Sequence, residues 1–294
     1  MFIFKAAVVG AGTMGGEIAQ VLAAADLQVV LKDVDQRFID QGLEKAREVT
    51  KGQLQGLVGK QKITEDQAEQ MLEQTMSRIT GSTDYRGFGD VDFVIEAVPE
   101  RIEIKKQVFA ELDACTPGHA ILASNTSSLS ITEMGAATGR GEKVIGFHFF
   151  FPASVMRLIE VIEGEETSEE TMQATVNFAQ QIRKMPIRCH EVPGFVVNRI
   201  LNSAASEIWR YKDESERSAS DIDKEIAEAK VTPMGPFYLS DLLGLDTVLH
   251  VAEHLERSYG DRFYVSPDMR ELVKGGNFGQ KTGKGFYDHG GSEG

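Results

Sequence analysis

The sequence predicts an α/β protein in which a doubly wound, mostly parallel sheet is followed by an all-α C-terminal domain. Short β-branched, apolar runs alternate with helical segments through the first part of the 294 residues, and only helical patterns follow residue 193. Strands that are apolar throughout are typical of a sheet covered by helices on both faces. Their alternation with helices indicates parallel connections. We therefore expect the sheet domain to span residues 1–190 and a helical domain to span residues 191–294.

The strands of the first domain are predicted from runs with the composition of buried strands. They are Ala6–Gly10, Gln28–Lys32, Val91–Ala97, Ala120–Ser124 and Lys143–Phe149. Helical periodicity marks segments between and after them. Examples are Gly16–Ala25, Glu103–Ala114 and Ser168–Ile182.

The second domain has helical periodicity without any further parallel strand. Its predicted helices are Phe195–Tyr211, Ser220–Ala229, Tyr238–Tyr259 and Asp268–Lys274.

One connection in the first domain is too long for a single crossover helix. From Asp35 to Ser77 the chain runs about forty residues with helical periodicity and no convincing strand. We therefore expect a helical insertion of two helices at about residues 35–77. Its stretch Lys45–Lys62 carries five basic residues against one acidic residue. Such a stretch is either the solvated face of a helix or a binding site for an anionic ligand.

The net charge limits the classes of partner that we expect, and the cysteine content bears on the cellular compartment. The formal net charge of −14 repels phosphate backbones and anionic membranes, so nucleic acid and membrane surfaces are not expected as partners. The only cysteines, Cys115 and Cys189, favour a reducing compartment, and a cytoplasmic location is expected. No metal site is expected, because His250 and His254 have no third ligand type nearby.

A glycine-rich motif, GAGTMG, follows the first predicted strand and opens a helix. Gly10 permits the tight turn, Gly12 lets the backbone approach a pyrophosphate, and Gly15 lets helix and strand pack closely. Asp33 stands 18 residues past Gly15, where it can bind a ribose 2′-hydroxyl and repel a 2′-phosphate. The pattern predicts a Rossmann-type domain that prefers NAD to NADP. The predicted cofactor site includes Gly10, Gly12, Thr13, Met14, Gly15 and Asp33.

His148 stands out among six histidines because it lies at the C-terminal end of an apolar strand, where ligands gather in open α/β sheets. Glu160 lies twelve residues later in the apolar run Leu158–Ile162. A carboxylate in a buried strand needs a partner, and a histidine would be oriented and made more basic by it. Such an imidazole suits removal of a hydroxyl proton near neutral pH. The pattern also allows a structural His–Glu pair inside the core.

The polar run Ser124–Ser128 follows the fifth candidate strand at the same sheet edge. It could hold a substrate carbonyl or the nicotinamide amide. Such a run alone is more often a helix cap.

These segments together closely resemble the L-3-hydroxyacyl-CoA dehydrogenase family, which includes bacterial 3-hydroxybutyryl-CoA dehydrogenases. The resemblance runs from about Lys5 to Asp288. Its blocks are Gly10–Gly15, Glu96–Glu100 with Lys105 and Lys106, Ser124–Leu129, Gly146–Pro152, Pro193–Arg199, Pro233–Asp246 and Lys281–Tyr287.

The resemblance implies that His148 is the catalytic base and Glu160 its orienting partner, with Ser127 and Asn198 completing the substrate site. It also implies a homodimer built through the C-terminal helices. The basic insertion would meet the CoA phosphates, with Lys60 as the best single candidate. Further cofactor contacts are expected from Glu100, Lys105 and Asn125.

Some positions depart from the family pattern. Phe151 stands where the family usually has Asn, and Ala153-Ser154 replaces the common Val-Pro or Ala-Pro. A stretch before Pro233, Ala229–Thr232, is less Gly-rich than usual. A single lost hydrogen bond is worth about 0.5–1.5 kcal/mol net. These departures therefore bear on substrate identity and chain length more than on reaction class.

The sequence thus predicts NAD-dependent oxidation of a (S)-3-hydroxyacyl-CoA, of short chain such as 3-hydroxybutyryl-CoA, to the 3-oxoacyl-CoA. A second enzyme hypothesis keeps the chemistry but places the hydroxyacyl group on a carrier protein, or uses a free hydroxy acid. A third hypothesis is a protein that binds NAD without turnover.

Overall fold

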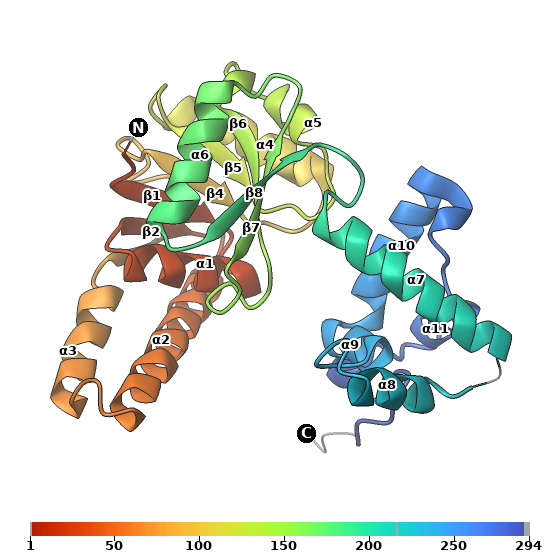
Figure 1. Cartoon of the computed structure of the whole chain (residues 1–294). Coiled ribbons are helices and arrows are strands. Elements are labelled where there is room, and N and C mark those ends of the chain that lie inside the picture. The colour runs from red at the N-terminus through yellow and green to blue at the C-terminus, as the bar shows by residue number, and fades with distance from the viewer. Residues whose placement is uncertain (1, 216, 291–294) are drawn as a thin grey trace. The chain divides into compact units, whose positions relative to one another are not determined.

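The computed structural model describes residues 2–215 and 217–290, and the chain divides into two compact units, Met1–Glu191 and Val192–Gly294. The first unit is a sheet with helices packed on its faces, and the second unit is a group of helices (Figure 1). The fold class predicted from the sequence is confirmed.

The sheet of the first unit has eight strands in the order β3-β2-β1-β4-β5-β6-β7-β8. Neighbouring strands are parallel except β6 and β7, which are antiparallel. The C-terminal ends of β1, β4, β5 and β6 consequently meet at one edge, where ligands bind in folds of this kind. The strands are β1 (Lys5–Val9), β2 (Gln28–Lys32), β3 (Ile79–Ser82), β4 (Phe93–Glu96), β5 (Ile121–Ser124), β6 (Val144–Phe149), β7 (Leu158–Glu163) and β8 (Met185–His190).

Helices α1 and α6 pack on one face of the sheet, and α4 and α5 lie on the other (Figure 1). Aromatic rings bind α6 to the strands, since the Phe178 ring lies 4.4 Å from Phe93 and 5.8 Å from Phe147, centroid to centroid. Phe147 directly precedes His148, so this packing holds the strand that carries the histidine. The helices are α1 (Thr13–Ala24), α2 (Gln36–Gly59), α3 (Glu65–Met76), α4 (Ile102–Cys115), α5 (Ile131–Gly135), the 3-10 helix η1 (Gly141–Lys143) and α6 (Glu169–Gln181).

The predicted helical insertion is found as α2 and α3, which form a hairpin between β2 and β3. Asp35 caps α2 by accepting a hydrogen bond from the Arg37 amide, and Thr64 with Gln67 forms a capping box at the start of α3. These caps satisfy amides that a helix leaves unpaired at its N-terminus, and they define where each helix begins.

Six strands of the sheet correspond to apolar runs of the sequence, with β7 at the run Leu158–Ile162 that carries Glu160. The two edge strands, β3 and β8, were not predicted. Only one residue of β3 and one of β8 are buried, and their sequences ITGS and MPIRCH mix polar residues, Gly and Pro with apolar ones. An edge strand is covered less completely than a central one, so its sequence lacks the continuous apolar run by which the inner strands were recognised.

The second unit contains α7 (Val197–Ser215), α8 (Ala219–Glu228), α9 (Pro236–Leu243), α10 (Leu245–Tyr259), η2 (Gly260–Arg262), α11 (Pro267–Lys274) and η3 (Gln280–Thr282). The sequence predicted one helix over Tyr238–Tyr259, but Gly244, with φ 94°, separates α9 from α10. Only glycine adopts such a backbone conformation readily, so the two helices meet at a turn. Trp209 and Phe237 are buried in the core of this unit.

Two buried carboxylates in the second unit bind the segment that contains Phe286 and Tyr287. Asp241 is fully buried and accepts hydrogen bonds from the amides of Phe286 and Tyr287. Asp223 accepts from the amides at the start of α9 and from the Tyr287 hydroxyl. Within the described residues, no helix is both long and apolar enough to cross a membrane.

Candidate active site

The glycine motif makes the turn from β1 into α1. A Cβ on Gly10 would lie 2.5 Å from the Ala97 carbonyl oxygen, and one on Gly15 would lie 1.7 Å from the Gly10 carbonyl oxygen. Both positions therefore require glycine. Gly12, by contrast, faces open space and is the N-cap of α1 without a side-chain capping bond. Thr13 and Met14 follow in the first turn. An anionic group can approach this helix N-terminus, so the geometry fits the pyrophosphate of a dinucleotide.

Asp33 lies at the C-terminal end of β2, beside this turn. Its Oδ2 accepts a 2.7 Å hydrogen bond from the Ala11 amide, and its Oδ1 accepts a 2.7 Å bond from the Val34 amide. The carboxylate therefore ties the end of β2 to the glycine turn. A position beside the turn is the one that recognition of a ribose hydroxyl requires.

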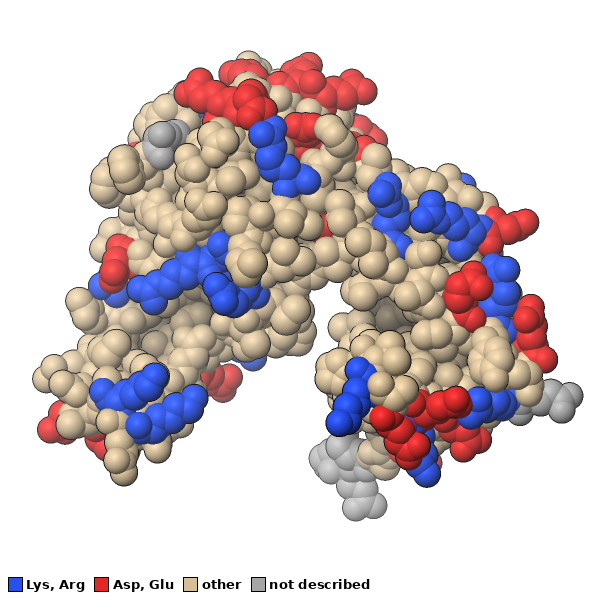
Figure 2. All heavy atoms as spheres, viewed as in Figure 1, with Lys and Arg blue, Asp and Glu red and all other residues tan. Residues whose placement is uncertain are grey.

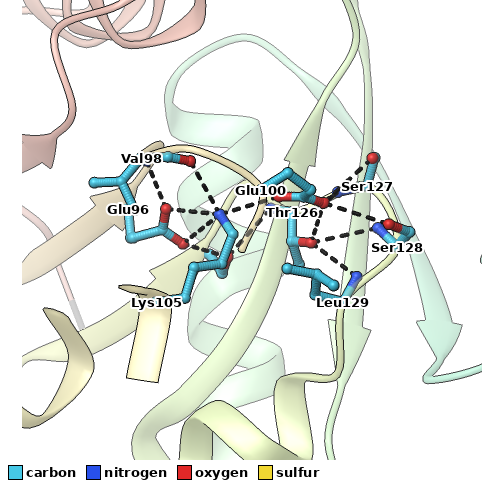
Figure 3. Close-up of polar contacts among 9 residues, drawn as sticks. Glu96, Val98, Glu100, Lys105, Thr126, Ser127, Ser128 and Leu129 are labelled. Carbon is cyan, nitrogen blue, oxygen red and sulfur yellow. Dashed lines mark hydrogen bonds and ion pairs between the residues drawn. The ribbon is translucent and has the colours of Figure 1, made fainter. Parts of the chain in front are cut away.

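A buried ion cluster lies at the ends of β4 and β5 (Figure 3). Lys105, from α4, is 1% exposed, and its Nζ lies 2.7 and 3.0 Å from the two carboxylate oxygens of Glu96. The same Nζ lies 3.2 Å from Oε2 of Glu100. Glu96, which is fully buried, also accepts hydrogen bonds from the Val98 amide and the Ser124 hydroxyl. One ammonium thus joins two carboxylates, and each charge has partners inside the protein.

Glu100 connects this cluster to the polar loop after β5 (Figure 3). Its Oε1 accepts hydrogen bonds from the Thr126 hydroxyl at 2.5 Å and from the Ser127 amide at 3.0 Å. Burial alone raises the pKa of Glu100, but the charge of Lys105 and these hydrogen bonds outweigh it, and the net pKa is lowered. The carboxylate is therefore ionised at neutral pH, and it holds Ser127 in place.

Asn125 joins the ends of β5 and β6. Its side-chain oxygen accepts a 2.8 Å hydrogen bond from the Phe149 amide, the residue next to His148. The polar loop is therefore fixed on one side to the ion cluster and on the other to the strand that carries the histidine.

His148 and Glu160 are directly opposite each other in the antiparallel β6–β7 pair. Nδ1 of His148 lies 2.8 Å from Oε2 of Glu160, and the side chains are 8% and 0% exposed. The Phe150 ring packs edge-on against the imidazole, with centroids 4.7 Å apart. A carboxylate that accepts from Nδ1–H selects the tautomer whose lone pair is on Nε2. The pair can thus accept a proton at Nε2 and stabilise the resulting imidazolium.

The basic stretch predicted at Lys45–Lys62 lies on α2 and the turn after it. Two of its members form ion pairs, Lys45 with Glu17 at 3.7 Å and Arg47 with Glu73 at 2.6 Å. The remaining three, Lys51, Lys60 and Lys62, are exposed to solvent. Figure 2 shows Lys and Arg side chains gathered on the α2–α3 hairpin, at the lower left of the view.

Asn198 lies in the first turn of α7, in the second unit, where its carbonyl oxygen accepts a hydrogen bond from the Asn202 side chain. Its role in the substrate site stays a prediction.

Sequence reasoning did not single out Glu96 and Thr126. Glu96 carried a signal of the same kind as Glu160, because it is an acidic residue within an apolar strand. A buried acid at a strand end needs a cation or several donors, and Lys105 nine residues later is that cation. Thr126 carried no separate signal, since it belongs to a run of hydroxyl residues.

The chain is similar to known proteins over nearly its whole length. Residues 5–192 match the family model for the 3-hydroxyacyl-CoA dehydrogenase NAD-binding domain, and residues 194–289 match the model for the C-terminal domain of the same enzymes. A probable 3-hydroxybutyryl-CoA dehydrogenase of Deinococcus radiodurans is 39% identical over 286 residues, covering 97% of this chain and 100% of that protein. The mitochondrial hydroxyacyl-coenzyme A dehydrogenase of Sus scrofa is 38% identical, covering 96% of this chain and 90% of that protein.

A solved structure has the same fold over the same length. The crystal structure of (S)-3-hydroxybutyryl-CoA dehydrogenase from Ralstonia eutropha matches with a TM-score of 0.90 and 37% identity, covering 99% of this chain and 100% of that one.

Proposed function

This chain belongs to the 3-hydroxyacyl-CoA dehydrogenase family, and on that premise we propose that it oxidises (S)-3-hydroxyacyl-CoA to 3-oxoacyl-CoA with His148 as the general base. Family membership, which the sequence motifs indicated, is confirmed, and with it the assignment as an NAD-dependent oxidoreductase. The short-chain substrate, 3-hydroxybutyryl-CoA, is proposed from the relatives that act on that thioester.

The observation that carries the proposal is the 2.8 Å contact between His148 Nδ1 and Glu160 Oε2, at the C-terminal end of β6. The end of β6 lies on the same sheet edge as the glycine turn after β1, because β1, β4, β5 and β6 are parallel. A proton acceptor and a dinucleotide turn at one edge are the two parts that hydroxyl oxidation requires.

In the proposed reaction, Nε2 of His148 takes the proton of the substrate hydroxyl. Positive charge then develops on the imidazole, and the buried carboxylate of Glu160 stabilises it where solvent screening is weak. NAD, when bound, accepts the hydride that leaves the substrate carbon. In the reverse direction His148 returns the proton to the oxygen of the 3-oxoacyl group.

Ser127 and Asn198 are proposed to orient the thioester end of the substrate. The support for Ser127 is its hydrogen bonding to Glu100, whose own position depends on Lys105. The Ser127 amide lies 3.0 Å and its hydroxyl 3.4 Å from Oε1 of Glu100, so the residue is already ordered before the substrate binds, which lowers the entropic cost of binding. Glu100, Lys105 and Asn125 are proposed to lie along the cofactor.

The exposed lysines of the α2–α3 hairpin are proposed to bind the CoA phosphates, with Lys60 as the principal contact. Lysine binds phosphate as a point charge, and a local positive charge offsets repulsion from the acidic chain. This contact distinguishes a CoA thioester from a carrier-protein substrate or a free hydroxy acid.

A homodimer through the C-terminal helices is also proposed. Its support is a set of exposed apolar side chains on α7 and α9 of the second unit, Ile200, Leu201, Leu239, Leu242 and Leu243. Sedimentation of the purified chain would measure the oligomeric state, and a monomer at micromolar concentration would contradict the proposal.

Steady-state reduction of acetoacetyl-CoA by NADH tests the proposed reaction. Turnover of the CoA thioester supports it. Turnover only of a carrier-protein thioester or a free oxo acid would support the second hypothesis, and NADH binding without any turnover would support a non-catalytic protein.

A further inference from the structure

The segment that connects β6 to β7, residues 150–157, links the strand of His148 to the strand of Glu160. It displays three apolar side chains to solvent in the chain as described, with Phe151 54%, Val155 68% and Met156 41% exposed. Exposed apolar side chains that lie close together in the sequence beside an active site indicate contact with an apolar ligand.

Lys184 binds the backbone of this segment. Its side chain is buried, and its Nζ donates hydrogen bonds to the carbonyl oxygens of Ala153 at 2.5 Å and Met156 at 2.7 Å. Burial lowers the pKa of Lys184, and the charge of Glu17 opposes that shift. A buried ammonium is costly unless its donors are satisfied, and here two of the three bind the backbone of one short stretch.

Glu17 holds the same stretch from α1. It is 2% exposed, and its Oε2 lies 3.2 Å from the Ser154 amide nitrogen and 3.4 Å from the Ser154 hydroxyl, both of which donate to it. A proline at position 154 would have neither donor. Ser154 therefore makes the contact with Glu17 through both its backbone and its side chain.

Two buried charges of opposite sign thus fix the backbone from Ala153 to Met156, and they act from different elements, α1 and the residue before β8. Fixing a backbone in this way reduces what must be ordered on binding. Phe151 is three residues after His148, so it lies within about 10 Å of it along the backbone.

We infer that Phe151 is a specificity-determining residue that contacts the acyl chain of the substrate, and that Glu17 and Lys184 are positioning residues for its segment. The inference rests on the proposed function, because the acyl chain extends from the carbon whose hydroxyl His148 deprotonates. The segment directly connects the strands of His148 and Glu160, and on that ground the acyl chain is the expected partner of its exposed apolar side chains. Each methylene that it buries there is worth about fourfold in binding.

The experiment compares acetoacetyl-CoA with 3-oxooctanoyl-CoA, both reduced by NADH. Phe151→Asn should lower the ratio of kcat/KM for the eight-carbon over the four-carbon substrate by about tenfold. The apolar ring that contacts the longer acyl chain is then replaced by a small polar side chain. Phe151→Leu is the matched control, and it should largely keep the wild-type ratio since it remains apolar.

An unchanged ratio in Phe151→Asn would overturn the inference. If the ratio stayed the same because kcat/KM fell equally with both substrates, Phe151 would be assigned to the cofactor or to a protein surface instead. If the wild type reduced neither thioester, the proposed function would fail, and that result is distinct from either of these.

The positioning residues are tested through the same ratio. Glu17→Ala should lower it in the wild-type background, whereas Glu17→Gln, which can still accept from Ser154, should keep more of it. In a Phe151→Asn background, Glu17→Ala should lower the ratio no further, because the side chain it positions is gone. Equal falls in both backgrounds would show that Glu17 acts on the ratio independently of Phe151, and an unchanged ratio in the wild-type background would leave Glu17 with a role in stability only; either result would contradict its role as a positioning residue.

Discussion

His148 and Glu160 occupy directly opposed positions on two antiparallel strands, with Nδ1 and Oε2 2.8 Å apart. The eleven residues between them form the rest of β6, a connecting segment and the start of β7. Because the register of two paired strands sets which residues face each other, the contact is part of the sheet itself. A base and its partner built into a sheet keep their geometry without help from a mobile loop.

Replacing His148 with Ala should lower kcat by about 10²–10⁴, the contribution expected of a general base. The measurement is acetoacetyl-CoA reduction at saturating NADH. NADH binding by the variant, followed by fluorescence, serves as the control and should stay near the wild-type value. Turnover close to that of the wild type would remove the assigned role.

Replacing Glu160 with Gln should lower kcat by about 10² or more, because the charge that stabilises the imidazolium is lost. A Gln amide can also donate to Nδ1, which favours the tautomer with the proton on Nε2. Glu163→Gln is a matched control, since Glu163 lies at the end of the same strand and is partly exposed. Equal kcat values for the two variants would argue that Glu160 is structural only.

Replacing Lys105 with Met should destabilise the protein by about 3–5 kcal/mol, because Glu96 would stay buried without its cation. Chemical denaturation of the full chain measures this change. Lys106→Met is the matched control, because Lys106 is more exposed and lies 3.9 Å from Glu133. The double variant Glu96→Gln with Lys105→Met should recover part of the loss, and failure to recover any would contradict the pairing.

The contribution of Glu100 to the free energy of unfolding should depend on pH, and the lowered pKa sets the direction of the change. The folded-state pKa of Glu100 is lowered, so its stabilisation is present above the unfolded value of about 4.3 and is lost as pH falls through the folded pKa. The free energy of unfolding of wild type should therefore exceed that of Glu100→Gln at pH 7, and the difference should shrink below about pH 4.3. A difference that grew on acidification would contradict this assignment.

Neutralising Lys60 and Lys62 together should raise KM for acetoacetyl-CoA about fivefold or more and leave kcat nearly unchanged, since exposed charge contacts contribute up to about 1 kcal/mol each. An acetoacetyl thioester that lacks the nucleotide part of CoA is the control substrate, and its KM should not change. An equal rise in KM for both substrates would place these lysines elsewhere than on the phosphates.

The inner strands and the glycine motif could be predicted because their signals are local. Continuous apolar runs mark β1, β2, β4, β5 and β6, and the glycines of the turn have no room for a side chain at positions 10 and 15. The edge strands β3 and β8 escaped prediction because exposure on an edge removes the apolar signal. The break at Gly244 escaped because helical periodicity continues across it.

By itself, the sequence determined the fold class, the dinucleotide turn and the presence of two ionisable residues, His148 and Glu160, in apolar strands. Composition and periodicity are properties of neighbouring residues, so they can be read without coordinates. Only the tertiary structure decided the partners of the other buried charges. Glu17 binds Ser154, which is 137 positions away in the sequence. Lys105 forms ion pairs with Glu96 and Glu100, and the sequence contains many other acidic residues. Pairing depends on the packing of whole elements, and that information is in no single stretch of the chain.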